Sequence, residues 1–172
     1  MIATGHNKWD TTMHTLTPVD ATANKAEKYE LLIKQAEAIL SSESDLIANM
    51  ANLTALLKDT FNWFWIGFYR VDTESNQLIL APFQGPLACT RINHGKGVCG
   101  EVWATGKTQI VDDVNAHPNH IACSSLSQSE IVVPVRNEAG EIIAVLDIDS
   151  DKLATFDEVD GEYLEQLVEL LK

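Results

Sequence analysis

The sequence predicts a single α+β domain in which helices at both ends of the chain pack against a largely antiparallel central sheet. Apolar residues recur at helical spacing near both ends of the chain, and shorter apolar runs separated by turn sequences fill the middle. At 172 residues and 45% hydrophobic, the chain can bury a core without disulfide staples. We therefore expect one domain.

The composition is strongly acidic, with a formal net charge of −13 and a pI near 4.6. The 12 basic residues are scattered and form no patch, which disfavours nucleic acid and anionic membranes as partners. No apolar run approaches the roughly 20 residues that cross a bilayer, and the start of the chain lacks the apolar segment of a signal peptide. We expect a cytoplasmic protein with small cationic or zwitterionic ligands.

Residues 1–24 are polar and lack an amphipathic period, so we interpret them as an N-terminal extension of a domain that spans residues 25–172. A first amphipathic helix follows from Asn24 to about Ser42, and Ser44 is the expected N-cap of a second helix. The expected buried stripes are Tyr29, Leu32, Ile33, Ala36, Ile39 and Leu40 in the first helix and Leu46, Met50, Leu53 and Leu57 in the second.

Aromatic and β-branched residues dominate segment 61–72, FNWFWIGFYRVD, which predicts a strand. The polar turn DTESNQ joins it to LILAPF as a hairpin. The aromatic side chains point to both faces of this strand, so one or two of them can line a pocket. Gly67 interrupts the strand and predicts a bulge or the close approach of another group.

A glycine-rich segment, residues 84–107, predicts a long loop that carries Cys89, followed by a short helix from about Gly97 to Thr105. Cys99 would lie in the first turn of this helix, where the helix dipole and free N–H groups can lower the pKa of a thiol.

The stretch around which we expect the site to be organised is residues 117–135, HPNHIACSSLSQSEIVVPV. If its start is helical, His120 and Cys123 share one face, and an imidazolium would favour the thiolate. A surface histidine that caps a turn is the alternative. Glu130 then heads an apolar strand, in which Pro134 predicts an edge position or a bulge.

Two more carboxylates lie on the next predicted strand, residues 142–150. Alternation places Asp147 and Asp149 on one face with Ile143 and Val145, the two acids roughly 7 Å apart. Acids on an apolar strand are costly unless paired or solvated, so they indicate a polar pocket at this end of the sheet. A solvated strand end is the alternative.

The C-terminal helix is expected to start at a capping box formed by Thr155 and Glu158. The three cysteines are spaced 10 and 24 residues apart, which fits poorly with a secreted disulfide framework. In a reducing cytosol, a paired cysteine is more often catalytic or redox-active than structural, whereas an inert buried thiol is the alternative for each one. We expect the cysteines and acids to close one small acidic thiol pocket.

Several short segments occur in a characteristic order along residues 25–172. They are Trp65-Ile-Gly-Phe-Tyr69, Phe83-Gln-Gly85, Ala88-Cys-Thr-Arg-Ile92, Gly95-Lys-Gly-Val-Cys-Gly100, His120-Ile-Ala-Cys123, Ser129-Glu-Ile-Val-Val-Pro134 and Val145-Leu-Asp-Ile-Asp-Ser150. In these segments the chain resembles the GAF-domain family and, within it, the free methionine-(R)-sulfoxide reductases. Ser124 departs from the pattern, which has an acidic residue there.

The resemblance implies a GAF-like catalytic domain that reduces the R-sulfoxide of free methionine. It implies Cys123 as nucleophile, Cys89 as the thiol that resolves the sulfenic acid, and Cys99 as an alternate thiol. No cofactor or metal is expected, and an external dithiol such as thioredoxin would recycle the enzyme. The implied substrate-binding groups are the walls Trp65 and Tyr69 and the acids Asp112, Glu130, Asp147 and Asp149. A homodimer formed through the helices is also implied.

A sulfoxide sulfur becomes electrophilic when its oxygen is protonated, so the site needs a thiolate on one side and an acid on the other. Clustered carboxylates raise one another's pKa, which would keep one of them protonated near neutral pH. Glu130 and Asp149 are the expected donors.

Two other functions stay open. A GAF module that senses a nucleotide or small metabolite would carry the cysteines only as core residues. A metal site could use Cys89, Cys99, Cys123, His94, His117 or His120, although no CxxC or HxxxH spacing supports it.

Overall fold

A computed structural model describes residues 16–18, 20, 22–121 and 123–171. Most of the predicted N-terminal extension, residues 1–15, 19 and 21, lies outside the described residues.

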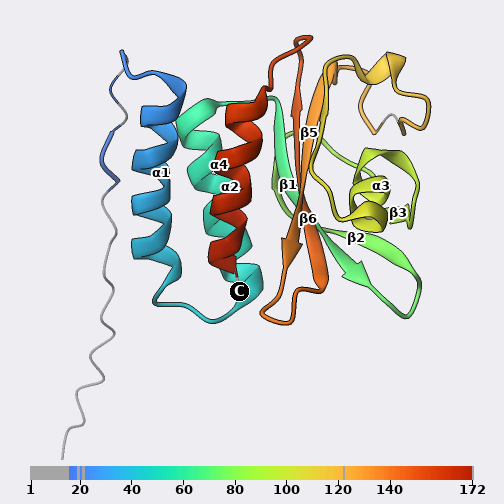
Figure 1. The fold of residues 1–172 in the computed structure, drawn as a ribbon, viewed down its shortest axis with the longest axis horizontal. Coiled ribbons are helices and arrows are strands. Elements are labelled where there is room, and N and C mark those ends of the chain that lie inside the picture. Colours follow the sequence, from blue (N-terminus) through green and yellow to red (C-terminus); the bar gives the residue numbers. More distant parts are fainter. Residues whose placement is uncertain (1–15, 19, 21, 122, 172) are drawn as a thin grey trace, which may run out of the picture.

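In Figure 1, helices α1, α2 and α4 lie on one side of the sheet and α3 lies on the other. The elements are α1 Lys25–Leu40, α2 Leu46–Phe61, β1 Trp65–Asp72, β2 Gln77–Gln84, β3 Arg91–Asn93, α3 Gly97–Thr105, β4 Gln109–Val111, the 3₁₀ turn η1 Val114–Ala116, β5 Ser129–Arg136, β6 Ile142–Ser150, α4 Glu158–Val168 and the 3₁₀ turn η2 Glu169–Leu171.

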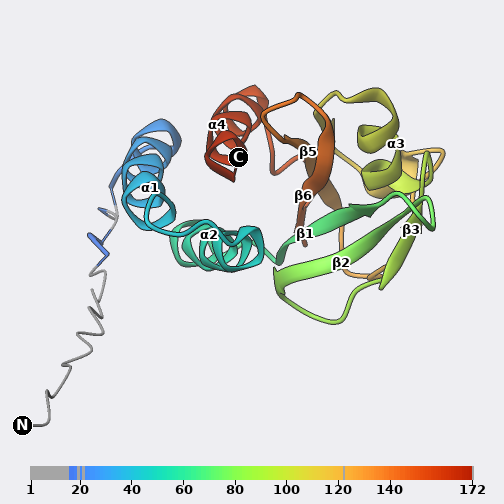
Figure 2. The same cartoon turned by 90° about the horizontal axis from the view of Figure 1, so that it is seen from below.

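The sheet has six strands in the order β3-β2-β1-β6-β5-β4, and every neighbouring pair is antiparallel. Seen from below, it curves around α3 (Figure 2). The α+β fold with a largely antiparallel sheet is confirmed. β4 pairs only with Glu130–Val132 of β5, so Pro134 lies where β5 has no partner on that side, as its missing N–H requires.

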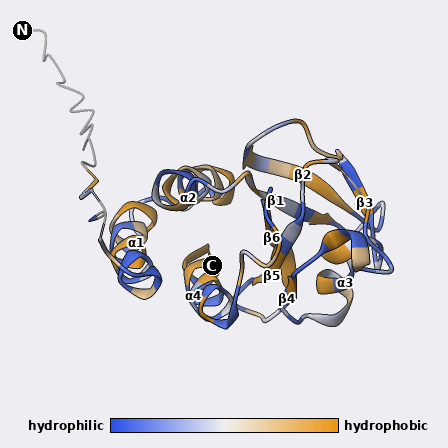
Figure 3. Cartoon of the chain, turned by 90° about the horizontal axis from the view of Figure 1, so that it is seen from above, coloured by the Kyte–Doolittle hydropathy of each residue, from blue (hydrophilic) through white to orange (hydrophobic). Residues whose placement is uncertain are grey.

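Each face of the sheet covers its own hydrophobic core. The three outer helices carry both hydrophobic and hydrophilic residues (Figure 3) and bury the first core, in which Ala144, Leu146 and Ile148 project from β6. Val145 projects into the second core, beneath α3. The predicted alternation along β6 therefore holds from residue 144 onward. Ile143 instead packs against the first core, because a register shift near its end leaves it without a partner on β5.

The N-cap residues of α2 and α4 differ from the predicted ones. Asp45, not Ser44, caps α2 by accepting a hydrogen bond from the Ala48 N–H. Asp157, not Thr155, caps α4, and its capping box is completed by Asp160. In both places the residue next to the helix offers a carboxylate, which accepts more strongly than a hydroxyl.

Candidate active site

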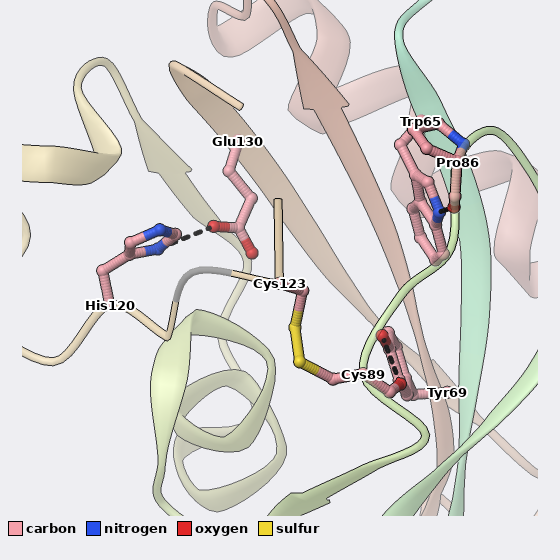
Figure 4. The surroundings of a disulfide bond; sticks show 7 residues. All are labelled: Trp65, Tyr69, Pro86, Cys89, His120, Cys123 and Glu130. Atoms are coloured by element: carbon pink, nitrogen blue, oxygen red, sulfur yellow. Dashed lines mark hydrogen bonds and ion pairs between the residues drawn. A yellow bond between two sulfur atoms is a disulfide. The ribbon is translucent and has the colours of Figure 1, made fainter. Parts of the chain in front are cut away.

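Two loops bring a pair of cysteines together at the side of the sheet that α3 covers. Cys89 lies between β2 and β3, and Cys123 lies between η1 and β5; the two form a disulfide with a Cα–Cα distance of 5.4 Å (Figure 4). Both cysteines are half-buried. The pairing that the resemblance implied is therefore present, in residues that are partly accessible to solvent.

A pocket opens beside this disulfide. It receives side chains from β1, β5, β6, the start of α3 and the two cysteine loops, and it encloses about 40 Å³ of space for solvent. Its lining residues are Phe64, Trp65, Tyr69, Leu87, Ala88, Ile92, Gly97, Val98, Cys99, His120, Ile121, Cys123, Ser124, Ser127, Glu130, Asp147 and Asp149. Most of the cysteines, aromatics and acids predicted for the site therefore line it; Cys89 reaches it only through its bond to Cys123, and Asp112 does not reach it.

Strand register explains why the acids gather. Asp149 of β6 is paired with Trp65 of β1 on one side and with Glu130 of β5 on the other. Asp147 lies two residues before Asp149 and therefore projects on the same face, diagonal to Glu130. Three carboxylates from two adjacent strands thus line one wall of the pocket, beside the Trp65 ring.

Close packing of the aromatic wall depends on Gly67. The Trp65 ring lies over this glycine, so a Cβ added there would come within 2.5 Å of the ring. The strand register also shifts between Gly67 and Tyr69. Both the bulge and the close approach predicted for Gly67 are confirmed.

The two aromatic walls also hold the loop that carries Cys89. The Trp65 indole N–H donates to the Pro86 carbonyl at 3.1 Å, and the Tyr69 hydroxyl donates to the Cys89 carbonyl at 3.0 Å (Figure 4). Sequence reasoning treated these rings as apolar walls and missed this anchoring role, because the partners are backbone carbonyls with no sequence signature.

Burial makes this pocket a place where acids keep their protons. The pKa of Glu130 is raised by burial and then by the charges of Asp147 and Asp149. Burial and the charge of Asp149 likewise raise the pKa of Asp147. Burial raises the pKa of Asp149 to about 6, against an opposing hydrogen bond from Ser127. These shifts all favour the protonated form of the carboxyl groups in the pocket.

The predicted activation of Cys99 is wrong. Cys99 does lie in the first turn of α3, but its side chain is buried, and burial followed by the charges of Asp147 and Glu130 raises its pKa well above the usual value. The helix dipole is the weaker influence here, because an unpaired thiolate would be desolvated among acids.

The predicted pairing of His120 with Cys123 on a helix is also wrong. Residues 117–120 form a turn, and the His120 Nδ1 atom lies 3.9 Å from the Glu130 Oε2 atom (Figure 4). Burial and the neighbouring His117 lower the pKa of His120, which favours the neutral imidazole. Asn119 fixes this turn to α3 by donating to the Gly95 carbonyl at 3.1 Å and to the Glu101 carboxylate at 2.7 Å.

Asp112 is the exception among the predicted site residues. It is exposed just after β4 and does not line the pocket. Because Val111 before it points inward, the alternation of the backbone turns the Asp112 side chain outward.

The acid cluster should make the protein less stable as the pH rises. The folded pKa of the buried Asp147 carboxyl lies above its unfolded value, so from about pH 4 up to the folded pKa the folded chain holds a proton that the unfolded chain has lost. We expect Asp147→Asn to raise the free energy of unfolding by about 1 to 2 kcal/mol at about pH 8 and to have little effect near pH 4.

Urea unfolding at the two pH values measures this difference. Asp112→Asn, which removes an exposed acid outside the pocket, is the matched control and should change stability by less than about 0.5 kcal/mol. A gain for Asp147→Asn that is as large near pH 4 as at pH 8 would contradict the account of the cluster.

The fold and the pocket define a class of protein that comparison identifies: the chain belongs to the GAF domain family, whose sequence model matches residues 44–172. GAF domain-containing protein A of Dictyostelium discoideum is 60% identical over 148 residues, which are 86% of this chain and 92% of that protein. A free methionine-R-sulfoxide reductase of Escherichia coli is 42% identical over 152 residues, 87% of this chain and 89% of that protein.

A solved structure is similar across nearly the whole chain. It is the free methionine-R-sulfoxide reductase from Neisseria meningitidis in complex with its substrate, 54% identical, with a TM-score of 0.87 over 91% of this chain and 93% of that one.

No helix among the described residues is long and apolar enough to cross a membrane.

Proposed function

We propose that this protein reduces free L-methionine-(R)-sulfoxide to methionine with its own cysteines as the reductant. The observation that carries the proposal is the disulfide between Cys89 and Cys123 at the edge of a pocket lined by carboxyl groups with raised pKa values. It joins a thiol couple and a proton donor, the two things that sulfoxide reduction needs. The relatives named as free methionine-R-sulfoxide reductases support the same reaction.

The chemistry proceeds in two steps. In the reduced protein, the Cys123 thiolate attacks the sulfoxide sulfur while Glu130 or Asp149 protonates the sulfoxide oxygen. The oxygen passes to Cys123 as a sulfenic acid, and methionine leaves. Cys89 then attacks the Cys123 sulfur, water leaves, and the disulfide forms.

The pocket also offers a reason to prefer a free amino acid. Its ionised carboxylates can hold the substrate ammonium group, and the Trp65 ring can hold the methyl group. The substrate carboxylate would bind at the start of α3, where no side chain caps the first-turn N–H groups and Gly97 and Val98 line the pocket. A methionine sulfoxide within a peptide lacks both terminal charges and should be rejected.

A non-catalytic sensing module is the alternative function. It would carry the cysteines as inert core residues, yet of the described cysteines only Cys99 is buried, while the two in the disulfide are half-buried at the pocket. The catalytic proposal accounts for this difference.

A stereospecific assay tests the proposal. Reduced protein should release methionine from the free R-sulfoxide, with at least roughly 100-fold slower release from the free S-sulfoxide and from the N-acetylated R-sulfoxide. Equal rates with the N-acetylated substrate would overturn the proposed recognition of the free ammonium group, and no release from any of them would overturn the reaction.

The disulfide between Cys89 and Cys123 must be reduced before the next turnover, and the chemistry requires a dithiol to do this. A protein dithiol such as thioredoxin would reduce the disulfide through a mixed disulfide, and a reducing compartment such as the cytoplasm would supply it. We place catalysis in residues 25–172, with residues 1–24 as an extension, and propose a homodimer formed through the helices.

A further inference from the structure

Three side chains that line the pocket lie close enough together to hold a metal ion. One ligand atom each from Cys99, Glu130 and Asp147 lies within 4.8 Å of the other two. They come from three elements, α3, β5 and β6, and are 3%, 6% and 7% exposed. In tetrahedral zinc sites, Zn–S and Zn–O distances of about 2.3 and 2.0 Å put ligand atoms roughly 3.5 Å apart. Small side-chain rotations would therefore close this group on an ion.

An independent observation points to a missing ligand at the same place. The Oδ1 atom of Asp147 is buried and has no hydrogen-bond partner by distance and angle among the residues that the structure describes, although the Cys99 thiol and the Glu130 carboxyl lie near enough to affect the pKa of this carboxyl by hydrogen bonding. Buried carboxylate oxygens in folded proteins are nearly always hydrogen-bonded, because an unsatisfied one costs free energy. A cation that binds in the pocket would satisfy it.

The size and charge of the pocket favour an ion. Its solvent space of about 40 Å³ exceeds the roughly 10 to 15 Å³ that one water needs, and so has room for an ion with its water ligand. Among the described residues that line it there is no lysine or arginine, while Asp149 adds a third acid beside the group. Of the described lining residues, only His120 can carry a positive charge beside these carboxylates, and its lowered pKa favours the neutral form.

We propose that Cys99, Glu130 and Asp147 bind one Zn²⁺ ion, or another thiophilic divalent cation, with water as the fourth ligand. The ion displaces the thiol proton and any carboxyl protons, which pass to solvent. A thiolate ligand selects Zn²⁺ or Cd²⁺ over Mg²⁺ and Ca²⁺, which prefer oxygen ligands only. If the proposed function is right, the bound ion also excludes methionine sulfoxide, because the two would share the same carboxylates. The metal site itself does not depend on the proposed function.

The disulfide form of the protein gives a clean test, because Cys99 is then its only free cysteine. Titration with Cd²⁺ should produce an ultraviolet thiolate-to-metal charge-transfer band that saturates at about one ion per chain. Equilibrium dialysis with Zn²⁺ should give the same stoichiometry, and excess Mg²⁺ should not displace either ion.

Variants assign the ligands. Cys99→Ser should abolish the charge-transfer band and weaken Zn²⁺ binding by roughly 100-fold, and Asp147→Asn should weaken it by roughly 10- to 100-fold. Asp112→Asn is the matched control, since it removes an exposed acid outside the pocket and should leave binding unchanged. Circular dichroism of each variant confirms that it is folded.

The proposal is overturned if wild-type protein gives no charge-transfer band, or if the band persists in folded Cys99→Ser. Equal weakening by Asp112→Asn and Asp147→Asn would also overturn it, since binding would then follow overall negative charge. Because no sulfoxide is present, failure here leaves the reductase proposal standing, and failure of the stereospecific assay leaves the metal site standing.

Discussion

Replacing Cys123 with serine should lower the rate of methionine release from free methionine-(R)-sulfoxide by at least roughly 1,000-fold. A hydroxyl has almost the shape of a thiol, but near neutral pH it provides no useful nucleophile and cannot carry the transferred oxygen as a sulfenic acid. Single-turnover release of methionine from pre-reduced protein, without added reductant, measures this loss directly.

The control is Ser125→Ala, which changes an exposed residue in the same loop. It should release methionine at close to the wild-type rate, which would show that the loss is not caused by disturbing the loop. Methionine release by Cys123→Ser within about tenfold of wild type would require another sulfur to be the nucleophile.

Replacing Cys89 with serine should separate the two chemical steps. The variant should release about one methionine per chain and then stop, because Cys123 stays a sulfenic acid with no thiol to condense with. With thioredoxin as the reductant, its steady-state rate should fall roughly 100-fold below that of wild type. Methionine quantification over time, with a sulfenic-acid trap, measures both results.

Cys99 is the thiol that could rescue this variant. Its burial and raised pKa leave little thiolate, so we expect it to be a poor substitute for Cys89. Sustained turnover in Cys89→Ser that disappears when Cys99→Ser is added would contradict this assignment and make Cys99 a second resolving thiol.

Periodicity predicted what depends on neighbours along the chain. The sheet, the helices and the shared face of Asp147 and Asp149 follow from spacing alone, because alternation is a local property of the backbone. The positions of Pro134 and Gly67 were also predictable, because proline has no N–H to donate to a neighbouring strand and glycine has no side chain to block a close approach.

What sequence could not predict depends on distant residues. Whether a cysteine in a first helical turn is activated depends on what covers it, and Cys99 is covered by acids from two strands far away in the sequence. The proximity of Cys99, Glu130 and Asp147 could not be predicted from their spacing in the sequence for the same reason. The shared face of His120 and Cys123 depended on a helix at this point, and Pro118 and Asn119 form a turn instead.

The central claim is that Cys123 and Cys89 together supply the two electrons that reduce the sulfoxide. The direct measurement adds one equivalent of free methionine-(R)-sulfoxide to fully reduced protein and combines methionine quantification with non-reducing peptide mapping. We expect about one methionine per chain, a disulfide-linked pair of peptides that contain Cys89 and Cys123, and Cys99 still free for alkylation. Methionine released while Cys89 and Cys123 both stay reduced would contradict the claim.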